Sequence, residues 1–252
     1  MTDGRQDSHR PTSTTSAERA AIEPAQLVLD LALRPASEAG DFLVSRCNGS
    51  AIALIDRWPD WPHPAAVIVG PASAGKSHLA AVWQARSQAS VVAASEIGEA
   101  TITTYRASAR PALVVEDIDR GIGDERVLFH LMNHAREASG HLLLTSRMAP
   151  GELQIALPDL RSRLRATPSV EIEQPDEAVL AALIVKLFGD RQLAVEPSII
   201  AYMLRHMERS FEAAATAVAA IDRLALAKQR KVTRPLAAAA LSAMSGRMIE
   251  ED

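Results

Sequence analysis

Eight residues beginning at Gly70 have the types and spacing of a phosphate-binding loop. The run Gly-Pro-Ala-Ser-Ala-Gly-Lys-Ser fits the pattern G-x-x-x-x-G-K-[S/T] without a gap and ends at Ser77. Gly70 lets the chain leave a strand sharply, and Gly75 lets the backbone come close to a phosphate. Backbone N–H groups and a helix N-terminus then bind the anion, Lys76 reaches the β- and γ-phosphates, and Ser77 holds Mg²⁺. A β-branched run before the loop and an apolar helix after it disfavour a chance match.

Carboxylates at the end of an apolar run form the second chemical feature. The sequence Ala-Leu-Val-Val at 112–115 leads into Glu116 and Asp117, with Asp119 two positions further on. In this Walker B pattern one carboxylate holds Mg²⁺ and the next orients the attacking water. Two registers remain open, Glu116 with Asp117 or Asp117 with Asp119, and the first replaces the common leading aspartate by glutamate. The plain alternative is a strand end with solvated acids.

Two further segments each allow two interpretations from their residues alone. In an extended chain, Leu27, Leu29 and Leu31 of the run that starts at Gln26 lie on one face. This alternation predicts either a first core strand or a short peptide that docks into a partner's hydrophobic pocket. The run Leu157–Arg165 carries three arginines. It predicts either a solvated basic turn of helix or an arginine directed at a phosphate across a subunit interface.

Composition sets the class of protein. The chain has 252 residues and a formal net charge of −4, so a general nucleic-acid-binding surface is not indicated. Its single cysteine, Cys47, excludes an internal disulfide framework and is expected to be a small buried residue. Residues 1–23 are polar and lack a signal-peptide core, so we expect a disordered tail. With no apolar run long enough to cross a membrane, a cytoplasmic protein is expected.

The order of the expected elements predicts the fold class. Strands are expected at 67–69, 90–94, 112–119, 141–147 and 170–172, with helices between them, and the chain becomes wholly helical after Asp176. Asp176 is the expected N-cap of the first of these helices, and the third is expected from Arg209 to Lys228. This order predicts an α/β protein with a parallel-sheet αβα base domain at 34–175 and an all-helical lid at 176–252.

Together these features resemble the AAA+ P-loop NTPases, within them the DnaA clade, and most closely the Hda family of replication regulators. The resemblance covers nearly the whole chain after the tail. The segment Gln26–Leu31 is similar to the family's sliding-clamp-binding hexapeptide, which places a clamp-binding peptide at 24–33. Phe129–Asn133 is similar to a helix of the DnaA clade, and Leu157–Leu164 is similar to the box VII motif.

The resemblance also implies roles for individual residues. Arg163 matches the arginine finger that acts in trans, Arg209 the sensor II arginine, and Thr145 and Ser146 the sensor I position. The implied nucleotide-binding residues are Gly70, Ala74, Gly75, Lys76, Ser77, His78, Thr145 and Arg209, and the implied Mg²⁺ ligands are Ser77, Glu116 and Asp117. Two positions depart from the family pattern, Glu116 in Walker B and Arg147, where the family often has aspartate.

The implied function is negative regulation of chromosomal replication initiation. Such a protein binds the DNA-loaded sliding clamp, the β subunit of DNA polymerase III, through residues 26–31 and reaches DNA only through the clamp. It holds ADP or ATP with Mg²⁺, has weak or no ATPase activity of its own, and presents Arg163 to the ATP of DnaA. A homo-oligomer is compatible with this class. The chain ends soon after the lid, which favours a regulator over an origin-binding initiator. Competing expectations are an independent AAA+ ATPase such as a helicase loader, and a DNA-binding initiator-like adaptor.

Overall fold

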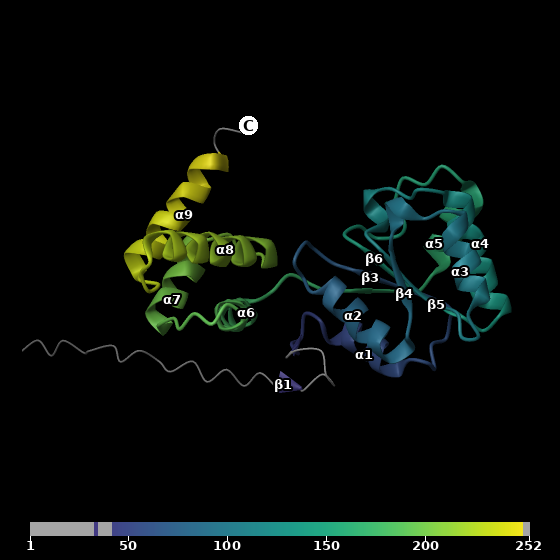
Figure 1. Ribbon diagram of the computed structural model, residues 1–252, viewed down its shortest axis with the longest axis horizontal. Helices are drawn as coiled ribbons and strands as arrows, with labels where there is room; N and C mark the ends of the chain where they lie inside the picture. Colours follow the sequence, from purple (N-terminus) through teal and green to yellow (C-terminus); the bar gives the residue numbers. More distant parts are fainter. Residues whose placement is uncertain (1–32, 35–41, 249–252) are drawn as a thin grey trace, which may run out of the picture.

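The computed structural model describes residues 33–34 and 42–248 (Figure 1). A short antiparallel pair comes first, β1 (Leu33–Arg34) and β2 (Phe42–Leu43). The sheet-forming part contains α1 (Gly49–Arg57), β3 (Ala65–Val69), α2 (Lys76–Ser87), β4 (Ser90–Ala93), the 3₁₀ turn η1 (Ala94–Glu96), α3 (Glu99–Ala107), β5 (Ala112–Glu116), the 3₁₀ turn η2 (Ile118–Arg120), α4 (Glu125–Glu137), β6 (His141–Ser146), α5 (Pro158–Ala166) and β7 (Ser169–Glu171). Four helices follow, α6 (Glu177–Gly189), α7 (Pro197–His206), α8 (Phe211–Lys228) and α9 (Arg234–Met248).

The main sheet has five strands in the order β4-β5-β6-β3-β7, and every pairing in it is parallel. Parallel strands need crossover connections, and here helices and turns supply them. β3 and β6 occupy the interior of the sheet, so the loops that follow them lie together at its carboxyl edge. This arrangement confirms the expected α/β fold.

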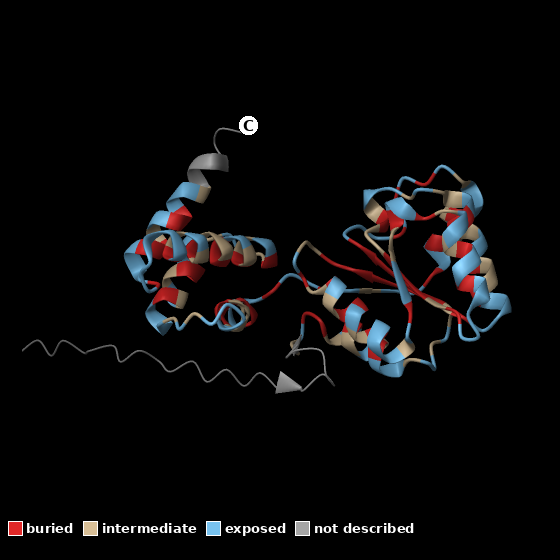
Figure 2. Cartoon of the chain, viewed as in Figure 1, coloured by how far each residue is buried: buried red, intermediate tan, exposed pale blue. Residues whose placement is uncertain are grey.

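Alternation along the strands divides the core into two layers. Val67 and Val69 of β3 belong to a buried cluster with residues of α3, α4 and α5, whereas Ala66 and Ile68 belong to a cluster with residues of α1 and α2. Successive side chains of a strand point to opposite faces, so the same sheet packs against helices on both sides. Figure 2 shows the central strands β3, β5 and β6 largely buried between helices whose outer faces are exposed, whereas the edge strand β4 is more exposed. The result is the expected αβα arrangement.

The four C-terminal helices have a hydrophobic core of their own, built from buried residues of α6, α7, α8 and α9. As expected, Asp176 caps α6, because its carboxylate accepts a hydrogen bond from the N–H of Val179 at 2.8 Å. Val179 and Phe211 join the cluster that contains α1 and α2. The first residues of α6 and α8 therefore pack on the sheet-forming part. No helix in the described part of the chain has the length and hydropathy of a membrane span.

Several expected bounds shift by one to three residues, as for β4, which ends at Ala93, and β7, which spans Ser169–Glu171, and three of the shifts bear on the site. The strand expected at 112–119 ends at Glu116, because Asp117 adopts a left-handed backbone conformation with φ of 57° and cannot continue a strand. The strand expected to reach Arg147 ends at Ser146. The helix expected from Arg209 begins at Phe211, because the Ser210 hydroxyl accepts a hydrogen bond from the N–H of Ala213 at 3.1 Å and caps it.

Candidate phosphate-binding site

The phosphate-binding loop connects β3 to α2 at the carboxyl edge of the sheet. Gly70 donates a backbone hydrogen bond to the carbonyl of Ser146 at 3.1 Å, and a Cβ on Gly70 would lie 3.0 Å from the Cβ of Ile172. Ser73 and Gly75 both have left-handed backbones, with φ of 59° and 91°. A residue without a side chain is therefore needed at Gly70 for packing and favoured at Gly75 for conformation. The structure thus gives a packing reason for Gly70 and a conformational reason for Gly75, and the approach of a phosphate to Gly75 stays a prediction.

Lys76 is the first residue of α2, and its side chain is buried by the loop that precedes it. Its Nζ donates hydrogen bonds to the carbonyl oxygens of Gly70 at 2.7 Å and Pro71 at 2.8 Å. Burial lowers the pKa of Lys76, and the positive charge of Arg147 lowers it further. Ser77 follows at the exposed N-terminus of α2. The loop therefore places a desolvated cation and an accessible hydroxyl at one helix N-terminus, where an anion is stabilised.

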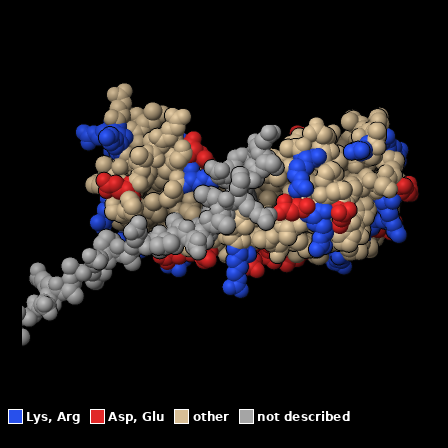
Figure 3. Space-filling model, turned by 90° about the horizontal axis from the view of Figure 1, so that it is seen from below, with Lys and Arg blue, Asp and Glu red and all other residues tan. Residues whose placement is uncertain are grey.

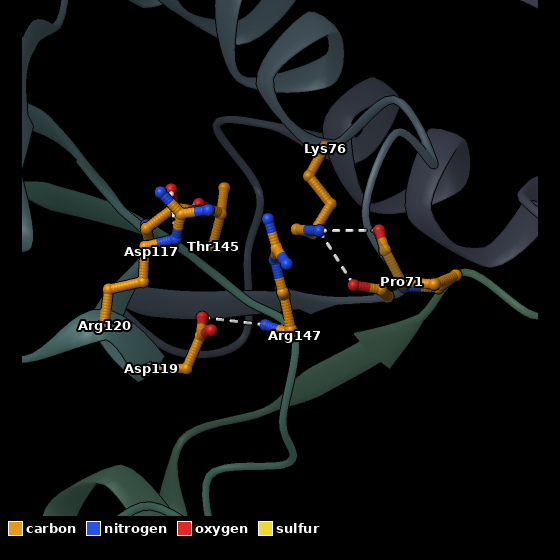
Figure 4. Close-up of polar contacts among 8 residues, drawn as sticks. Pro71, Lys76, Asp117, Asp119, Arg120, Thr145 and Arg147 are labelled. Atoms are coloured by element: carbon orange, nitrogen blue, oxygen red, sulfur yellow. Dashed lines mark hydrogen bonds and ion pairs between the residues drawn. The ribbon is translucent and has the colours of Figure 1, made fainter. Parts of the chain in front are cut away.

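The carboxylates after β5 lie near this lysine. Asp117 and Asp119 raise the pKa of Lys76, which opposes the effect of burial. The N–H of Asp117 donates to the Thr145 hydroxyl at 3.0 Å (Figure 4). Alternation along β5 places Glu116 on the same face as Val114, which packs in the cluster of α1 and α2. All three predicted acids therefore gather at one strand end.

Thr145 and Ser146, the residues expected at the sensor I position, lie next to this strand end, because β6 pairs with β5 in parallel. Thr145 and Ser146 are both buried. The Thr145 hydroxyl accepts from Asp117, whereas the Ser146 hydroxyl donates to the carbonyl of Met148 at 2.6 Å. Thr145 therefore positions the backbone of an acidic residue, and Ser146 fixes the turn that follows its own strand.

Residues of the four C-terminal helices also lie near the phosphate-binding loop. Phe211 and Ala74 belong to one hydrophobic cluster, and Arg209 lies two residues before Phe211 in the sequence. The guanidinium of Arg209 pairs with Glu177 at 2.9 Å, and both side chains are exposed. For His78, burial lowers the pKa and the charge of Lys186 on α6 lowers it further.

Arg163 lies apart from these groups. It belongs to α5, where the ring of Phe129 on α4 lies 5.3 Å from its Cζ, and its Nε is buried. Among the described residues, no hydrogen bond or ion pair joins Arg163 to Lys76, Asp117 or Thr145. The structure therefore does not bring Arg163 to the phosphate loop of its own chain. The predicted clamp-binding residues Gln26, Leu27, Leu29 and Leu31 lie outside the described residues.

The structure adds Arg147 to the site, a position that the sequence marked only as a departure from a family pattern. Its backbone N–H donates to Asp119 at 2.8 Å, and its side chain extends toward Lys76 (Figure 4). The available sequence signal was its place as the last residue of the strand expected at 141–147.

Comparisons with known proteins relate the chain to replication initiators. Residues 176–241 match the family model described as Hda, lid domain. The chromosomal replication initiator protein DnaA of Lachnoclostridium phytofermentans is 28% identical over 151 residues, which cover 57% of this chain and 33% of that protein. The chain thus aligns with about a third of the length of that relative.

Solved structures share the fold. Domain III of the Thermotoga maritima replication initiation protein DnaA superposes with a TM-score of 0.67 at 16% identity, over 80% of this chain and 94% of that one. AMPPCP-bound DnaA from Aquifex aeolicus superposes with a TM-score of 0.60 at 20% identity, over 77% of this chain and 67% of that one. The Thermotoga maritima RuvB Holliday junction branch migration motor superposes with a TM-score of 0.59 at 14% identity, over 78% of this chain and 66% of that one. The C-terminal helices are thus similar to the Hda lid domain, the chain is related in sequence to part of DnaA, and its fold is similar to that of DnaA domain III.

Proposed function

We propose that this chain is a negative regulator of chromosomal replication initiation that stimulates ATP hydrolysis by DnaA while bound to the DNA-loaded sliding clamp. The observation that carries the proposal is the match of residues 176–241 to the Hda lid domain, because it separates this chain from initiators that share only the fold. The relationship to DnaA supports a DnaA-associated role. Beyond this role, the proposal includes binding of this chain to the clamp and stimulation of ATP hydrolysis by DnaA.

A nucleotide site is the first component. Lys76 is a buried cation at a helix N-terminus, and this geometry fits the phosphates of ADP or ATP. Ser77 with Glu116 or Asp117 would hold Mg²⁺, which neutralises phosphate charge when it is bound. The AMPPCP-bound Aquifex DnaA supports nucleotide binding within this fold. Glu116 is one methylene longer than the usual aspartate, so we expect the chain's own hydrolysis to be weak.

Arg163 is the second component, as an arginine finger directed at the ATP of DnaA. Its position on α5, away from the phosphate loop of its own chain, supports action in trans. The face of Phe129 stabilises a guanidinium at this distance and restricts its rotamers. An arginine at the transferred phosphoryl group stabilises the charge that develops there, and such a group contributes about 10³- to 10⁵-fold in rate.

The third component is the segment 26–31, which we propose binds the clamp. A leading glutamine and alternating leucines suit an extended peptide in a hydrophobic pocket. Tethering the regulator to the clamp raises its effective concentration near DnaA on the same DNA. Contact with DNA is then indirect. On the face seen in Figure 3, Lys and Arg side chains are interspersed with Asp and Glu.

The test of the finger compares Arg163→Ala with Arg165→Ala. Both arginines belong to α5, but Arg165 is exposed, and its guanidinium donates a long hydrogen bond to the carbonyl of Gly151, at 3.4 Å. We expect Arg163→Ala to fold, bind the clamp and lose stimulation of ATP–DnaA hydrolysis by about 10³-fold, while Arg165→Ala keeps it. Equal stimulation by both variants would refute the assignment.

A second candidate function is an independent AAA+ ATPase. The observation that favours it is the complete phosphate loop beside the carboxylates of Asp117 and Asp119. Rapid turnover of free ATP by the purified chain, without clamp or DnaA, would favour that function and direct attention to Glu116 and Asp117.

A further inference from the structure

The point where β6 meets the phosphate loop places Arg147 in the centre of the site. β6 lies between β5 and β3, and Ser146 is in register with Val69, the last residue of β3. The carbonyl of Ser146 also accepts the hydrogen bond from Gly70, where the loop begins. The next residue, Arg147, therefore starts at the boundary between the loop and the acidic strand end.

Hydrogen bonds hold the backbone of Arg147 from both sides. Its N–H donates to a carboxylate oxygen of Asp119 at 2.8 Å. On the other side, the N–H of Met148 donates to the Ser146 hydroxyl at 3.0 Å, and that hydroxyl donates to the carbonyl of Met148. These hydrogen bonds fix the position of the backbone that carries the Arg147 side chain. From there the guanidinium extends toward the Nζ of Lys76 (Figure 4).

Two positive side chains thus converge, and their neighbouring acids are engaged elsewhere. Asp119 accepts from the backbone N–H of Arg147, and Asp117 pairs with Arg120 at 3.5 Å. Within the described residues, no carboxylate lies within ion-pair distance of the Arg147 guanidinium. The Arg147 charge lowers the pKa of Lys76, so the two cations lie close enough to repel each other. An anion between two such groups would relieve this repulsion.

We propose that Arg147 is a phosphate-binding residue in cis that contacts the terminal phosphate of a nucleoside triphosphate opposite Lys76. The inference rests on the nucleotide site of the proposed function and adds a determinant of nucleotide choice to it. The loop backbone and Lys76 hold the phosphates from the α2 side, whereas Arg147 reaches them from the end of β6. The planar guanidinium can donate two parallel hydrogen bonds to one phosphate, which a lysine cannot do. A nucleoside diphosphate lacks the terminal phosphate that Arg147 would contact in a triphosphate.

Titration calorimetry of the full chain with Mg²⁺ and either AMPPCP or ADP tests this role. We expect Arg147→Ala to weaken AMPPCP binding about tenfold or more, as for the loss of a charge-assisted contact, and ADP binding less than about threefold. The affinity of Arg147→Lys for AMPPCP should lie between that of Arg147→Ala and that of the unchanged chain. The matched control is Arg110→Ala, which removes an exposed arginine before β5, at the opposite edge of the sheet, and should change neither affinity.

The two nucleotides distinguish a failure of the Arg147 role from a failure of the nucleotide site. If the unchanged chain binds both nucleotides and Arg147→Ala leaves AMPPCP binding intact, or weakens both nucleotides equally, the role of Arg147 is overturned and the nucleotide site stands. If the unchanged chain binds neither nucleotide, the nucleotide site and the role of Arg147 are overturned together. Thermal unfolding of Arg147→Ala checks that the variant is folded, as expected for an exposed side chain whose backbone bonds are retained.

Discussion

Gly123 is the position at which a single methyl group is expected to disturb the acidic side of the site. It lies between η2 and α4, where its N–H donates to the carbonyl of Ala94 at 2.9 Å. A Cβ at this position would lie 2.5 Å from the carbonyl oxygen of Ser95 and 2.8 Å from that of Ile97. Both contacted atoms belong to the backbone, so rotation of a side chain cannot relieve the overlap.

The magnitude follows from these distances. An ordinary contact begins at 3.4 Å, so the segment that contains η2 must move from η1 by nearly 1 Å in Gly123→Ala. Overpacking of this kind costs about 1–3 kcal/mol, and we expect about 2 kcal/mol here. For a chain of this size that free energy corresponds to a fall in Tm of about 4–8 °C. Because η2 follows Asp117, nucleotide affinity should fall as well.

Thermal unfolding followed by circular dichroism measures this effect, with Gly151→Ala as the control. A Cβ on Gly151 would meet no atom within 4 Å, so the control should change Tm by about 2 °C or less. Equal Tm values for the two variants would refute the packing argument at Gly123. A lower Tm with unchanged nucleotide affinity would refute the proposed link between η2 and the phosphate site.

Three further predictions follow from the site, the N-terminal segment and the half-buried His141. Lys76→Ala should weaken ADP and AMPPCP binding alike, by about 10- to 100-fold in calorimetry, because it removes the buried cation at the loop; unchanged affinity would argue against a phosphate site. The double variant Gln26→Ala with Leu29→Ala should abolish clamp binding in a pull-down without changing Tm, whereas a large fall in Tm would restore the core-strand interpretation. Burial lowers the pKa of His141, so the unfolded chain binds a proton more readily, and stability should be lost as pH falls below the ordinary histidine pKa of about 6.5. His141→Phe should reduce the fall in Tm between about pH 7.5 and about pH 5.5, and an identical fall would contradict the sign of the shift.

Sequence reasoning predicted the parts of the fold that depend on local pattern. The loop from Gly70 to Ser77 has a fixed spacing, and its neighbours β3 and α2 are found where hydrophobic runs predicted them. Asp176 as a helix cap also needed only its own residue type and the helix that follows. Such features require no knowledge of distant contacts.

Features that depend on contacts distant in sequence could not be predicted in this way. The left-handed backbone at Asp117 is held by Thr145, which is 28 positions away in the sequence. The direction of the Arg147 side chain depends on the order of β5, β6 and β3 in the sheet and on Asp119. The contact of Arg163 with Phe129 depends on the packing of α5 on α4. Strand order and helix packing are tertiary properties, and they decide which charged residues share a site.

The most direct test of the central claim is phosphate release from ATP–DnaA in a single turnover. The reaction is run alone, with this chain, with DNA-loaded clamp, and with both. The proposed function predicts fast release only when chain and clamp are both present, and loss of that stimulation with Arg163→Ala. Release at the basal rate in all four mixtures, with rapid hydrolysis of free ATP by this chain alone, would contradict it.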